Sequence, residues 1–259
     1  MTLLSNIIAI AEHAGQAILA VYQQDNAAFN ITDKADASPL TAADLAAHQV
    51  IITALTTLTP DIPVLSEEAA DISWDIRQHW QRYWLVDPLD GTKEFIKRNG
   101  EFTVNIALIE QGEPVLGVVH APVLAKSYYA AKGDGAFLKQ ASGVSRLKVN
   151  QASRQQLVKV VGSRSHPSPD LAGYLAQFPQ HEMVPVGSSL KFCLVAEGSA
   201  DVYPRFGPTM QWDTGAGHII ALEAGAKVSF TGIAAKVYQR EQLLNPNFLV
   251  SALLSATGD

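Results

Sequence analysis

The spacing of apolar residues near the N-terminus predicts two helices. The first pattern recurs every three or four positions over residues 3–22 and comprises Leu4, Ile7, Ile8, Ala11, Ile18, Val21 and Tyr22. The second pattern follows Thr41-Ala42-Ala43-Asp44, which has the form of a helix capping box, and it stops before Pro60. We therefore expect helices over residues 3–22 and 41–58.

Short apolar runs of β type follow in the next part of the chain. They cover residues 62–65, 83–86, 102–109, 115–119, 127–131 and 136–138. Gln-Gly-Glu-Pro and Gly-Asp-Gly sequences, which are typical of turns, separate several of these runs. This clustering predicts a largely antiparallel meander.

Beyond about residue 155, strands and helices are expected to alternate. The predicted strands are 157–161, 182–186, 201–203 and 227–230, and the predicted helices are 170–178, 189–197 and 214–224. Such alternation is typical of a second sheet flanked by helices. The sequence thus predicts an α+β chain with layered sheets and two intimate sub-domains, an N-terminal half over residues 1–150 and a C-terminal half over residues 151–259.

The composition excludes several classes of protein. A chain of 259 residues that is 47% apolar and only 17% charged is not a disordered or fibrous protein. Its 25 acidic and 19 basic side chains give a net charge of −6, whereas nucleic-acid binding depends on an excess of Lys and Arg. We expect no nucleic-acid partner, and these quantities leave the oligomeric state open.

The cellular location can be approached from the cysteine and charge pattern. Cys193 is the only cysteine, and the first 33 residues lack the Lys or Arg of a secretory signal. The apolar stretches near residues 7–22 and 114–125 contain polar side chains, so neither reaches the roughly 18 residues that a membrane span needs. We expect a cytoplasmic protein without an integral span, and peripheral attachment to the cytoplasmic face of the inner membrane stays open.

The strongest chemical signal is a β-type run that ends in a polar cluster. Residues 83–86 lead directly into Asp87-Pro88-Leu89-Asp90-Gly91-Thr92. Polar groups at the end of a strand can converge on a site without disrupting the sheet. Asp beside Pro and Gly also caps turns, so this segment alone favours neither interpretation.

Two further acidic positions change this balance. Glu67 and Glu68 follow the run 62–65, and Asp213 stands at the start of a predicted helix. Each has a simpler interpretation, as a solvated loop or as a helix cap. Together, and without a His or Cys cluster, these carboxylates favour a hard cation such as Mg²⁺ and disfavour zinc.

Other phosphate chemistries do not fit the spacing. A Cys-x5-Arg loop would need Arg at the position of Ser199, and no Gly-x4-Gly-Lys-Ser/Thr loop occurs. Hydrolases with an aspartyl nucleophile use Asp-x-Asp, whereas Asp87 and Asp90 are three positions apart. Water activated by a metal remains.

The three acidic segments, in this order, resemble motifs of a known superfamily. Ser66-Glu67-Glu68, the segment 87–92 and Trp212-Asp213 are similar to those of the Mg²⁺-dependent, lithium-sensitive phosphomonoesterases of the inositol monophosphatase superfamily, and the likeness runs from the first helix to residues 248–251. Lys93-Glu94-Phe95 resembles the 3′(2′),5′-bisphosphate nucleotidases of the CysQ type, where inositol phosphatases more often have Thr-Asn-Phe. The same likeness extends to Ser163-Arg164-Ser165-His166, Gly187-Ser188-Ser189-Leu190-Lys191 and Tyr203-Pro204-Arg205.

The resemblance implies a layered α/β/α/β/α sandwich with a site for two or three Mg²⁺ ions that Li⁺ inhibits. The implied metal ligands are Glu67, Asp87, Asp90, Asp213 and the backbone carbonyl of Leu89, with Glu68 behind them. Thr92 and Asp44, together with Glu67, would orient and deprotonate the attacking water. The substrate would contact Gly91, Thr92 and the metal ligands Glu67, Leu89, Asp90 and Asp213, and its nucleotide part would be held by His166, Ser188, Lys191 and Arg205.

Some of these residues also have a purely structural interpretation. The capping box explains Asp44 without catalysis, and a His in a loop or a Lys on a helix is usually a surface group. Cys193 lies in an apolar helical run and is expected to be a core residue without chemistry. Gly215 stands where the family often has Ala, which would weaken the start of that helix by up to ~1 kcal/mol and with it binding at that turn. The length of the loop 69–74 varies in such proteins, so the approach to Glu67 stays open.

The sequence therefore predicts a phosphatase that removes the 3′-phosphate of adenosine 3′,5′-bisphosphate to give AMP and phosphate. It would also act on 3′-phosphoadenosine 5′-phosphosulfate, in sulfur assimilation and nucleotide recycling. An inositol or sugar monophosphatase with the same metal site is an alternative, against which residues 93–95 argue. A non-catalytic nucleotide sensor is another, but it should have lost a metal ligand, and none is missing. The ranking of substrates and the number of metals bound at rest stay open.

Overall fold

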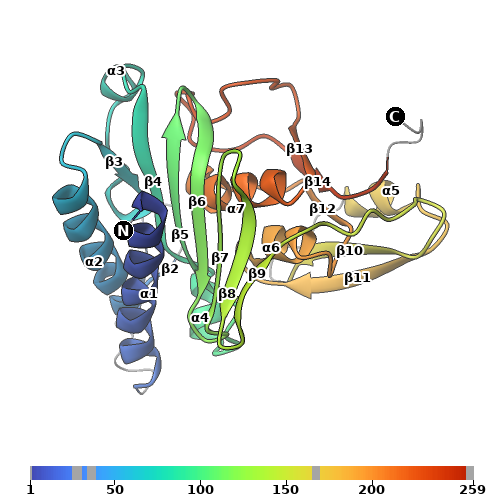
Figure 1. The fold of residues 1–259 in the computed structure, drawn as a ribbon, viewed down its shortest axis with the longest axis horizontal. Coiled ribbons are helices and arrows are strands. Elements are labelled where there is room, and N and C mark those ends of the chain that lie inside the picture. Colours follow the sequence, from blue (N-terminus) through green and yellow to red (C-terminus); the bar gives the residue numbers. More distant parts are fainter. Residues whose placement is uncertain (1, 25–30, 34–38, 165–169, 255–259) are drawn as a thin grey trace.

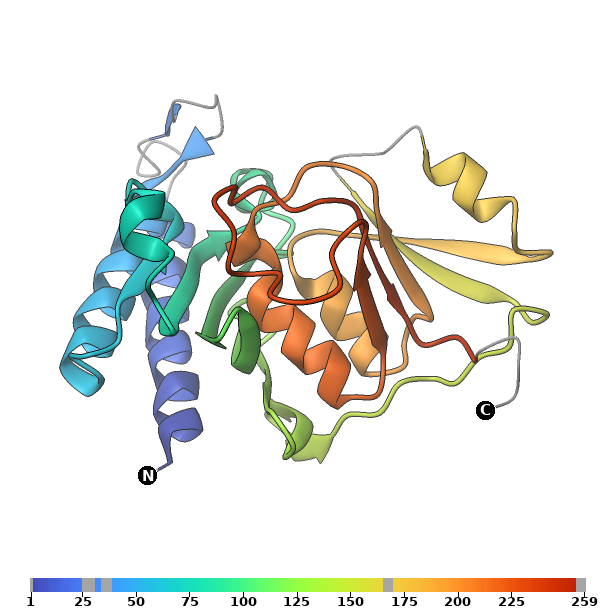
Figure 2. The same cartoon turned by 90° about the horizontal axis from the view of Figure 1, so that it is seen from above.

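The computed structural model describes residues 2–24, 31–33, 39–164 and 170–254 and arranges them in five layers (Figures 1 and 2). Two helices, α1 (Leu3–Tyr22) and α2 (Ala42–Leu58), cover one face of a seven-stranded sheet. Helices α6 (Leu190–Ala196) and α7 (Gln211–Glu223) lie between this sheet and a five-stranded sheet, whose far face carries α5 (Leu171–Leu175). The predicted α/β/α/β/α sandwich and the α+β class are confirmed.

Both predicted N-terminal helices are present and pack on each other. The side chain of Thr2 caps α1 by accepting a hydrogen bond from the backbone N–H of Ser5 at 3.3 Å. One apolar cluster holds the inner faces of both helices against the seven-stranded sheet, through Ile7, Ala11, Ala14, Ile18, Ala47, Ile51 and Leu55.

Helix α1 is the one described helix that is long and apolar enough to cross a membrane, by length and composition alone. This differs from the sequence-based expectation that no stretch would reach that length. The core helix of a globular protein passes the same test of length and composition. Here the apolar face of α1 is buried against α2 and the sheet.

The seven-stranded sheet contains the predicted meander. Its order is β3-β4-β5-β6-β7-β8-β9, and every pair is antiparallel except β3 and β4. The strands are β3 (Val64–Ser66), β4 (Arg82–Asp90), β5 (Thr103–Glu110), β6 (Glu113–Ala121), β7 (Lys126–Ala131), β8 (Gly135–Gln140) and β9 (Gly143–Arg146). The short helices η2 (Glu67–Ala69) and α3 (Trp74–Arg77) lie on the connection that makes β3 parallel to β4. Strand β9 was not predicted, because all four of its residues are exposed and form no apolar pattern.

The five-stranded sheet is mixed and includes a strand that was not predicted. Its order is β11-β10-β12-β14-β13. The strands are β10 (Val158–Ser163), β11 (His181–Val186), β12 (Val202–Arg205), β13 (Lys227–Phe230) and β14 (Phe248–Ser251). Strand β14 lies between β12 and β13 and is antiparallel to both. The remaining elements are β1 (Thr32–Asp33), β2 (Pro39–Leu40) and α4 (Thr92–Ile96).

The two halves of the chain share a core around α7. One apolar cluster joins Leu85 and Ala107 of the large sheet with Phe192 of α6, Trp212 of α7 and Phe248 of the small sheet. The connection from β9 to β10 contains residue 150, where the sequence predicts the boundary between sub-domains. The shared apolar cluster contains residues from both sides of this boundary. The division into two sub-domains therefore stays a prediction.

Helix α7 approaches its neighbours so closely that glycine is required on both sides. A Cβ atom at Gly117 of β6 would lie 2.5 Å from Cγ2 of Ile219 and 2.7 Å from the carbonyl oxygen of Ala216. A Cβ atom at Gly217 would lie 2.5 Å from Cγ of Phe192. The close packing fixes α7, and therefore its N-terminus, relative to both sheets.

We expect Gly117→Ala to lower the free energy of unfolding by about 1–3 kcal/mol, because the added methyl group overpacks this interface. Gly173→Ala in α5 is a matched control, since none of the described atoms lies within 4 Å of a Cβ at that position. Alanine favours a helix, so the control should be neutral or slightly stabilising. Urea unfolding of both variants measures the difference, and an unchanged midpoint for Gly117→Ala would contradict the close approach of α7.

Candidate active site

Strands β3 and β4 bring Glu67 and Asp87 together at one edge of the large sheet. The strands are parallel with Ser66 opposite Val86, so the residues that follow, Glu67 and Asp87, are neighbours. Their side chains share a hydrogen bond. Two acidic segments that are separate in the sequence thus form one cluster.

A bulge adds Asp90 to this cluster. In a regular strand, residues three positions apart point to opposite faces. Asp87 lies opposite Asn105 of β5 and Asp90 lies opposite Thr103, so three steps along β4 match two along β5. The extra residue in β4 brings Asp90 to the side of Asp87.

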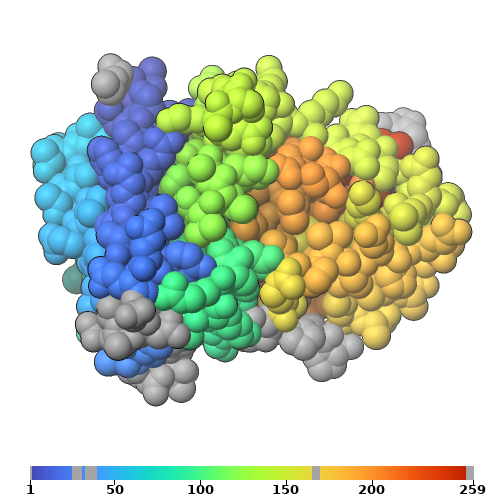
Figure 3. All heavy atoms as spheres, turned by 90° about the horizontal axis from the view of Figure 1, so that it is seen from below, coloured from blue at the N-terminus to red at the C-terminus, as the bar shows by residue number. Residues whose placement is uncertain are grey.

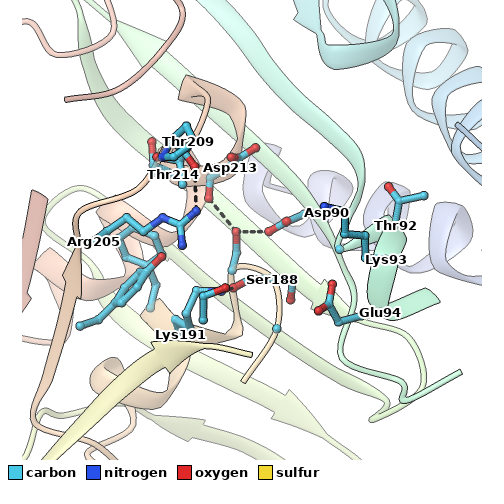
Figure 4. A pocket seen from close by; sticks show the side chains of 17 residues that line it. Asp90, Thr92, Lys93, Glu94, Ser188, Lys191, Arg205, Thr209, Asp213 and Thr214 are labelled. Carbon is cyan, nitrogen blue, oxygen red and sulfur yellow. Dashed lines mark hydrogen bonds between the residues drawn. The ribbon is translucent and has the colours of Figure 1, made fainter. Parts of the chain in front are cut away.

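Asp213 reaches the same cluster from the N-terminus of α7. Its Oδ2 accepts a hydrogen bond of 2.8 Å from the backbone N–H of Met210, so Asp213 caps α7 from the third position of the helix. The sequence predicts it as the N-cap residue itself, but α7 begins at Gln211 and its N-cap is Met210. The hydroxyl of Ser189 lies 2.7 Å from Oδ2 of Asp90 and 2.6 Å from the carbonyl oxygen of Asp213. Ser189 therefore ties the start of α6 to both acidic segments, through the contacts drawn as dashed lines in Figure 4.

The carboxylates repel one another strongly. Burial, followed by the charges of Glu67, Asp90 and Asp213, raises the pKa of Asp87 well above its usual range. Burial and the charges of Asp90 and Glu67 likewise raise the pKa of Asp213. Burial raises the pKa of Asp90 as well, although the charge of Lys191 opposes this shift. The site therefore holds an excess of buried negative charge.

This donor set fits a hard cation. Carboxylate and carbonyl oxygens are the ligands that Mg²⁺ prefers. The carbonyl oxygen of Leu89 lies at the same place, 3.4 Å from the hydroxyl of Thr92. Among the described residues, no three His, Cys, Asp or Glu side chains form a ready-made metal cluster. The fit therefore rests on the shared negative charge and on the oxygen donors.

The contacts of Asp44 are compatible with both roles that the sequence leaves open, helix capping and catalysis. Its Oδ2 accepts a hydrogen bond of 2.8 Å from the backbone N–H of Thr41 and so completes the capping box of α2. Its Oδ1 accepts one of 3.3 Å from the hydroxyl of Thr92. Thr92 begins α4 directly after Gly91, whose φ of 95° is left-handed and favours glycine. The cap holds Asp44 in place, and its other oxygen contacts the hydroxyl of Thr92.

A cavity of about 240 Å³ opens beside these residues. Figure 4 shows Asp90 and Thr92 on one side of it and Lys191 and Arg205 on the other. Its lining includes Asp90, Gly91, Thr92, Ser188, Ser189, Lys191, Tyr203, Arg205 and Asp213. The cavity thus joins an acidic wall from the first half of the chain and α7 to a basic wall from the second half.

The model of the inositol monophosphatase family matches residues 2–256. The chain belongs to the inositol monophosphatase family. It is 57% identical over 250 residues to a 3′(2′),5′-bisphosphate nucleotidase CysQ of Salmonella typhimurium strain LT2, covering 96% of this chain and 99% of that relative. It is 54% identical to the protein of that name in Escherichia coli K12, with the same coverage. A crystal structure of CysQ from Bacteroides thetaiotaomicron superposes with a TM-score of 0.84 at 42% identity, covering 96% of this chain and 97% of that one.

In the basic wall of the cavity, Lys191 is buried and Arg205 is partly buried. Burial lowers the pKa of Lys191 to about 8, against the charge of Asp90, which raises it. The ammonium group donates a hydrogen bond to the carbonyl oxygen of Ser188 and lies 5.6 Å from the centre of the Tyr203 ring. Arg205 donates from Nη2 to the carbonyl oxygen of Pro208 at 2.7 Å. Its buried Nε has no hydrogen-bond partner in the described part of the chain.

Three other predicted features have different outcomes. His166 lies outside the described residues. Cys193 is buried, and burial raises the pKa of its thiol well above the usual range, as expected of a core cysteine. Gly215 has a structural reason that the sequence did not reveal, since a Cβ there would lie 3.0 Å from Cδ2 of Leu85 and 3.2 Å from Cβ of Ala107.

Sequence reasoning assigned no role to Asn105 or to Ser189. The amide nitrogen of Asn105 donates to Oδ2 of Asp90 at 3.3 Å and to the hydroxyl of Ser189 at 2.9 Å. The hydroxyl of Thr103 donates to Oδ1 of Asn105 at 2.9 Å. The signal that could have found Asn105 is an amide side chain within the largely apolar run 102–109.

We expect Asp90→Asn to abolish turnover and leave the fold intact, because the amide keeps the shape and loses the charge that attracts Mg²⁺. Without metal the variant should melt at the same temperature or higher, since it relieves repulsion among buried carboxylates. Addition of Mg²⁺ should raise the melting temperature of the wild type more than that of the variant. Near-native turnover at saturating Mg²⁺ would rule out Asp90 as a ligand.

Thr92→Ala and Asp44→Asn are each expected to lower kcat by about 10²–10⁴-fold with a small change in KM. If the two side chains act as one unit, the double variant should be no slower than the slower single variant. Steady-state kinetics of the three proteins test this, with a thermal melt to monitor the cap of α2. Additive losses would leave Asp44 with its capping role alone.

Proposed function

We propose that this chain is a Mg²⁺-dependent phosphomonoesterase that removes the 3′-phosphate of adenosine 3′,5′-bisphosphate and of 3′-phosphoadenosine 5′-phosphosulfate. The observation that carries the proposal is one cavity with an acidic wall at Asp90 and Asp213 and a basic wall at Lys191 and Arg205. The acidic wall suits a phosphate that arrives with metal ions, and the basic wall suits a second anionic group. The names of the relatives support the same reaction.

Glu67, Asp87, Asp90, Asp213 and the carbonyl oxygen of Leu89 would hold Mg²⁺. When bound, Mg²⁺ neutralises charge on the phosphate and makes a water molecule easier to deprotonate. The protein residues would complete the chemistry at the hydroxyl of Thr92. Because this hydroxyl donates to Oδ1 of Asp44, its oxygen is free to accept a hydrogen bond from the attacking water. The proton of the water would pass to Thr92 as the proton of Thr92 passes to Asp44.

The basic wall would select the substrate. A phosphate monoester carries close to two negative charges, and guanidinium and ammonium groups bind it through charge-assisted hydrogen bonds. Lys191 is buried, and burial lowers its pKa even though the charge of Asp90 raises it, so a bound anion would further stabilise its charged form. An inositol monophosphate has no second anion to occupy this wall. Every predicted metal ligand is also present, which argues against a non-catalytic sensor.

We place this activity in the cytoplasm, in sulfur metabolism and nucleotide recycling. The comparisons give no support to the peripheral membrane attachment that the sequence leaves open. Two or three Mg²⁺ ions and inhibition by Li⁺ stay part of the proposal.

The test is phosphate release from adenosine 3′,5′-bisphosphate and from inositol 1-phosphate, measured side by side with and without Mg²⁺. We expect rapid release from the bisphosphate only when Mg²⁺ is present, and inhibition by Li⁺. Preference for inositol 1-phosphate would instead identify an inositol phosphatase. Nucleotide binding without release would identify a sensor.

Lys191→Met should lower kcat/KM for the bisphosphate by ~10–100-fold, the effect of a lost charge-assisted hydrogen bond of about 1.5–3 kcal/mol. Hydrolysis of a small monophosphate should change little. Lys191 is charged below its pKa of about 8, so kcat/KM of the wild type for the bisphosphate should fall as pH rises through this value. The variant should lack this fall.

Lys139→Met is a matched control, because Lys139 forms an ion pair with Glu12 and is half exposed. Equal losses on both substrates in Lys191→Met would mean that Lys191 supports the fold or the metal site.

A further inference from the structure

We propose that Glu101 is a positioning residue that sets the affinity for the nucleotide part of the substrate, by fixing the turn at residues 187–191 against the acidic wall. This inference rests on the function proposed above. Glu101 lies in the connection between α4 and β5, and sequence reasoning gave it no role.

Glu101 connects the two halves of the chain through three hydrogen bonds. Its carboxylate accepts bonds of 2.8 and 2.7 Å from Nε and Nη2 of Arg164, which directly follows β10. Its Oε2 also accepts a bond of 2.9 Å from the backbone N–H of Gly187, which directly follows β11. Arg164 donates in turn to the carbonyl oxygen of Pro185 at 2.7 Å. Figure 3 shows the green segment around residue 100 against the yellow segment around residue 160 at this junction.

The turn that Glu101 holds carries two of the residues proposed to hold the nucleotide, Ser188 and Lys191. Ser188 lines the cavity, and its φ of 48° is in the left-handed region that non-glycine residues rarely adopt. The ammonium group of Lys191 donates to the carbonyl oxygen of Ser188. The turn therefore determines where Lys191 points. The uncommon backbone conformation of Ser188 must be supported by the residues around the turn.

The turn is anchored on both sides of Ser188. On one side, Glu101 accepts from the N–H of Gly187, and on the other, the hydroxyl of Ser189 contacts Oδ2 of Asp90. Gly187 lies so close to Glu94 and Glu101 that an added Cβ would be 2.6 Å from Cγ of Glu94 and 2.8 Å from the carbonyl oxygen of Glu101. Loss of the Glu101 anchor would release the turn at Gly187, whereas Ser189 would still be held at Asp90.

The charge on Glu101 is suited to this role. Burial raises its pKa, but the hydrogen bonds from Arg164 and from the N–H of Gly187 outweigh burial and hold the pKa below its usual range. The ion pair is partly exposed, with side-chain exposures of 42% for Arg164 and 22% for Glu101. An exposed pair contributes little stability by itself. Glu101 thus acts by holding three hydrogen-bond donors in a fixed geometry around its carboxylate.

Kinetics on adenosine 3′,5′-bisphosphate and on a small monophosphate test the proposal, with the 259-residue chain and Mg²⁺. Glu101→Gln should raise KM for adenosine 3′,5′-bisphosphate by roughly tenfold, the size of one lost charge-assisted hydrogen bond, with kcat within about twofold. Arg164→Gln should have a smaller effect, because the bond to Gly187 remains. The double variant should be no worse than Glu101→Gln. Glu101→Asp should not rescue KM, since the shorter side chain cannot reach both partners.

Glu110→Gln is the matched control, because Glu110, the last residue of β5, pairs with Arg82 at 3.9 Å and both side chains are about half exposed. It should leave KM and kcat unchanged. Hydrogen exchange gives a readout that does not depend on activity, and peptides covering residues 186–192 should exchange faster in Glu101→Gln than in the wild type and the control.

The outcomes separate this inference from the proposed function. If the wild type does not hydrolyse the bisphosphate, the proposed function fails, and binding of the bisphosphate measured by calorimetry together with hydrogen exchange still tests Glu101. Unchanged exchange at 186–192 would overturn the positioning role. A loss of kcat equal for the bisphosphate and a small monophosphate would also overturn it, because it would assign Glu101 to the fold or to the metal site.

Discussion

Mutual repulsion among Glu67, Asp87, Asp90 and Asp213 is the constraint on which the rest of this structure depends. Their carboxylates are drawn together at the end of a sheet, where three of them have raised pKa values. Because these groups repel one another, they would not assemble by themselves in the absence of a cation. The surrounding frame must therefore impose the cluster. A parallel strand pair positions Glu67 and Asp87, a bulge positions Asp90, and a helix cap positions Asp213.

The rigidity of that frame comes from α7 and its position between two sheets. Gly117 and Gly217 allow the backbone of the helix to approach β6 and α6 at distances that any side chain would prevent. Because the apolar cluster around α7 draws on both halves of the chain, the N-terminus of the helix cannot move independently of the strand ends. Close packing here is what makes it possible to hold like charges in a fixed arrangement.

Several residues serve the frame and the site at once. Asp44 caps a helix with one oxygen and faces Thr92 with the other. Ser189 links α6, β4 and α7 through a single hydroxyl. Such double use explains why the structural interpretation of Asp44 and Asp213, which the sequence makes attractive, does not compete with a role in chemistry. A cap is a means of holding a carboxylate in one orientation.

The sequence by itself determined the features that depend on nearby residues. Apolar periodicity predicted both N-terminal helices, most strands of the meander and the alternation of the second half, because periodicity reflects which face of each element is buried. The resemblance of short motifs predicted the acidic cluster and the family. Tertiary structure decided the rest. Strand β14 lies between β12 and β13, and Asp90 reaches Asp87 through a bulge, because strand pairing is fixed by partners far away in the chain. Asn105, Ser189 and Glu101 gain their roles only from what lies across the sheet or across the junction of the two halves, and no local pattern records those neighbours.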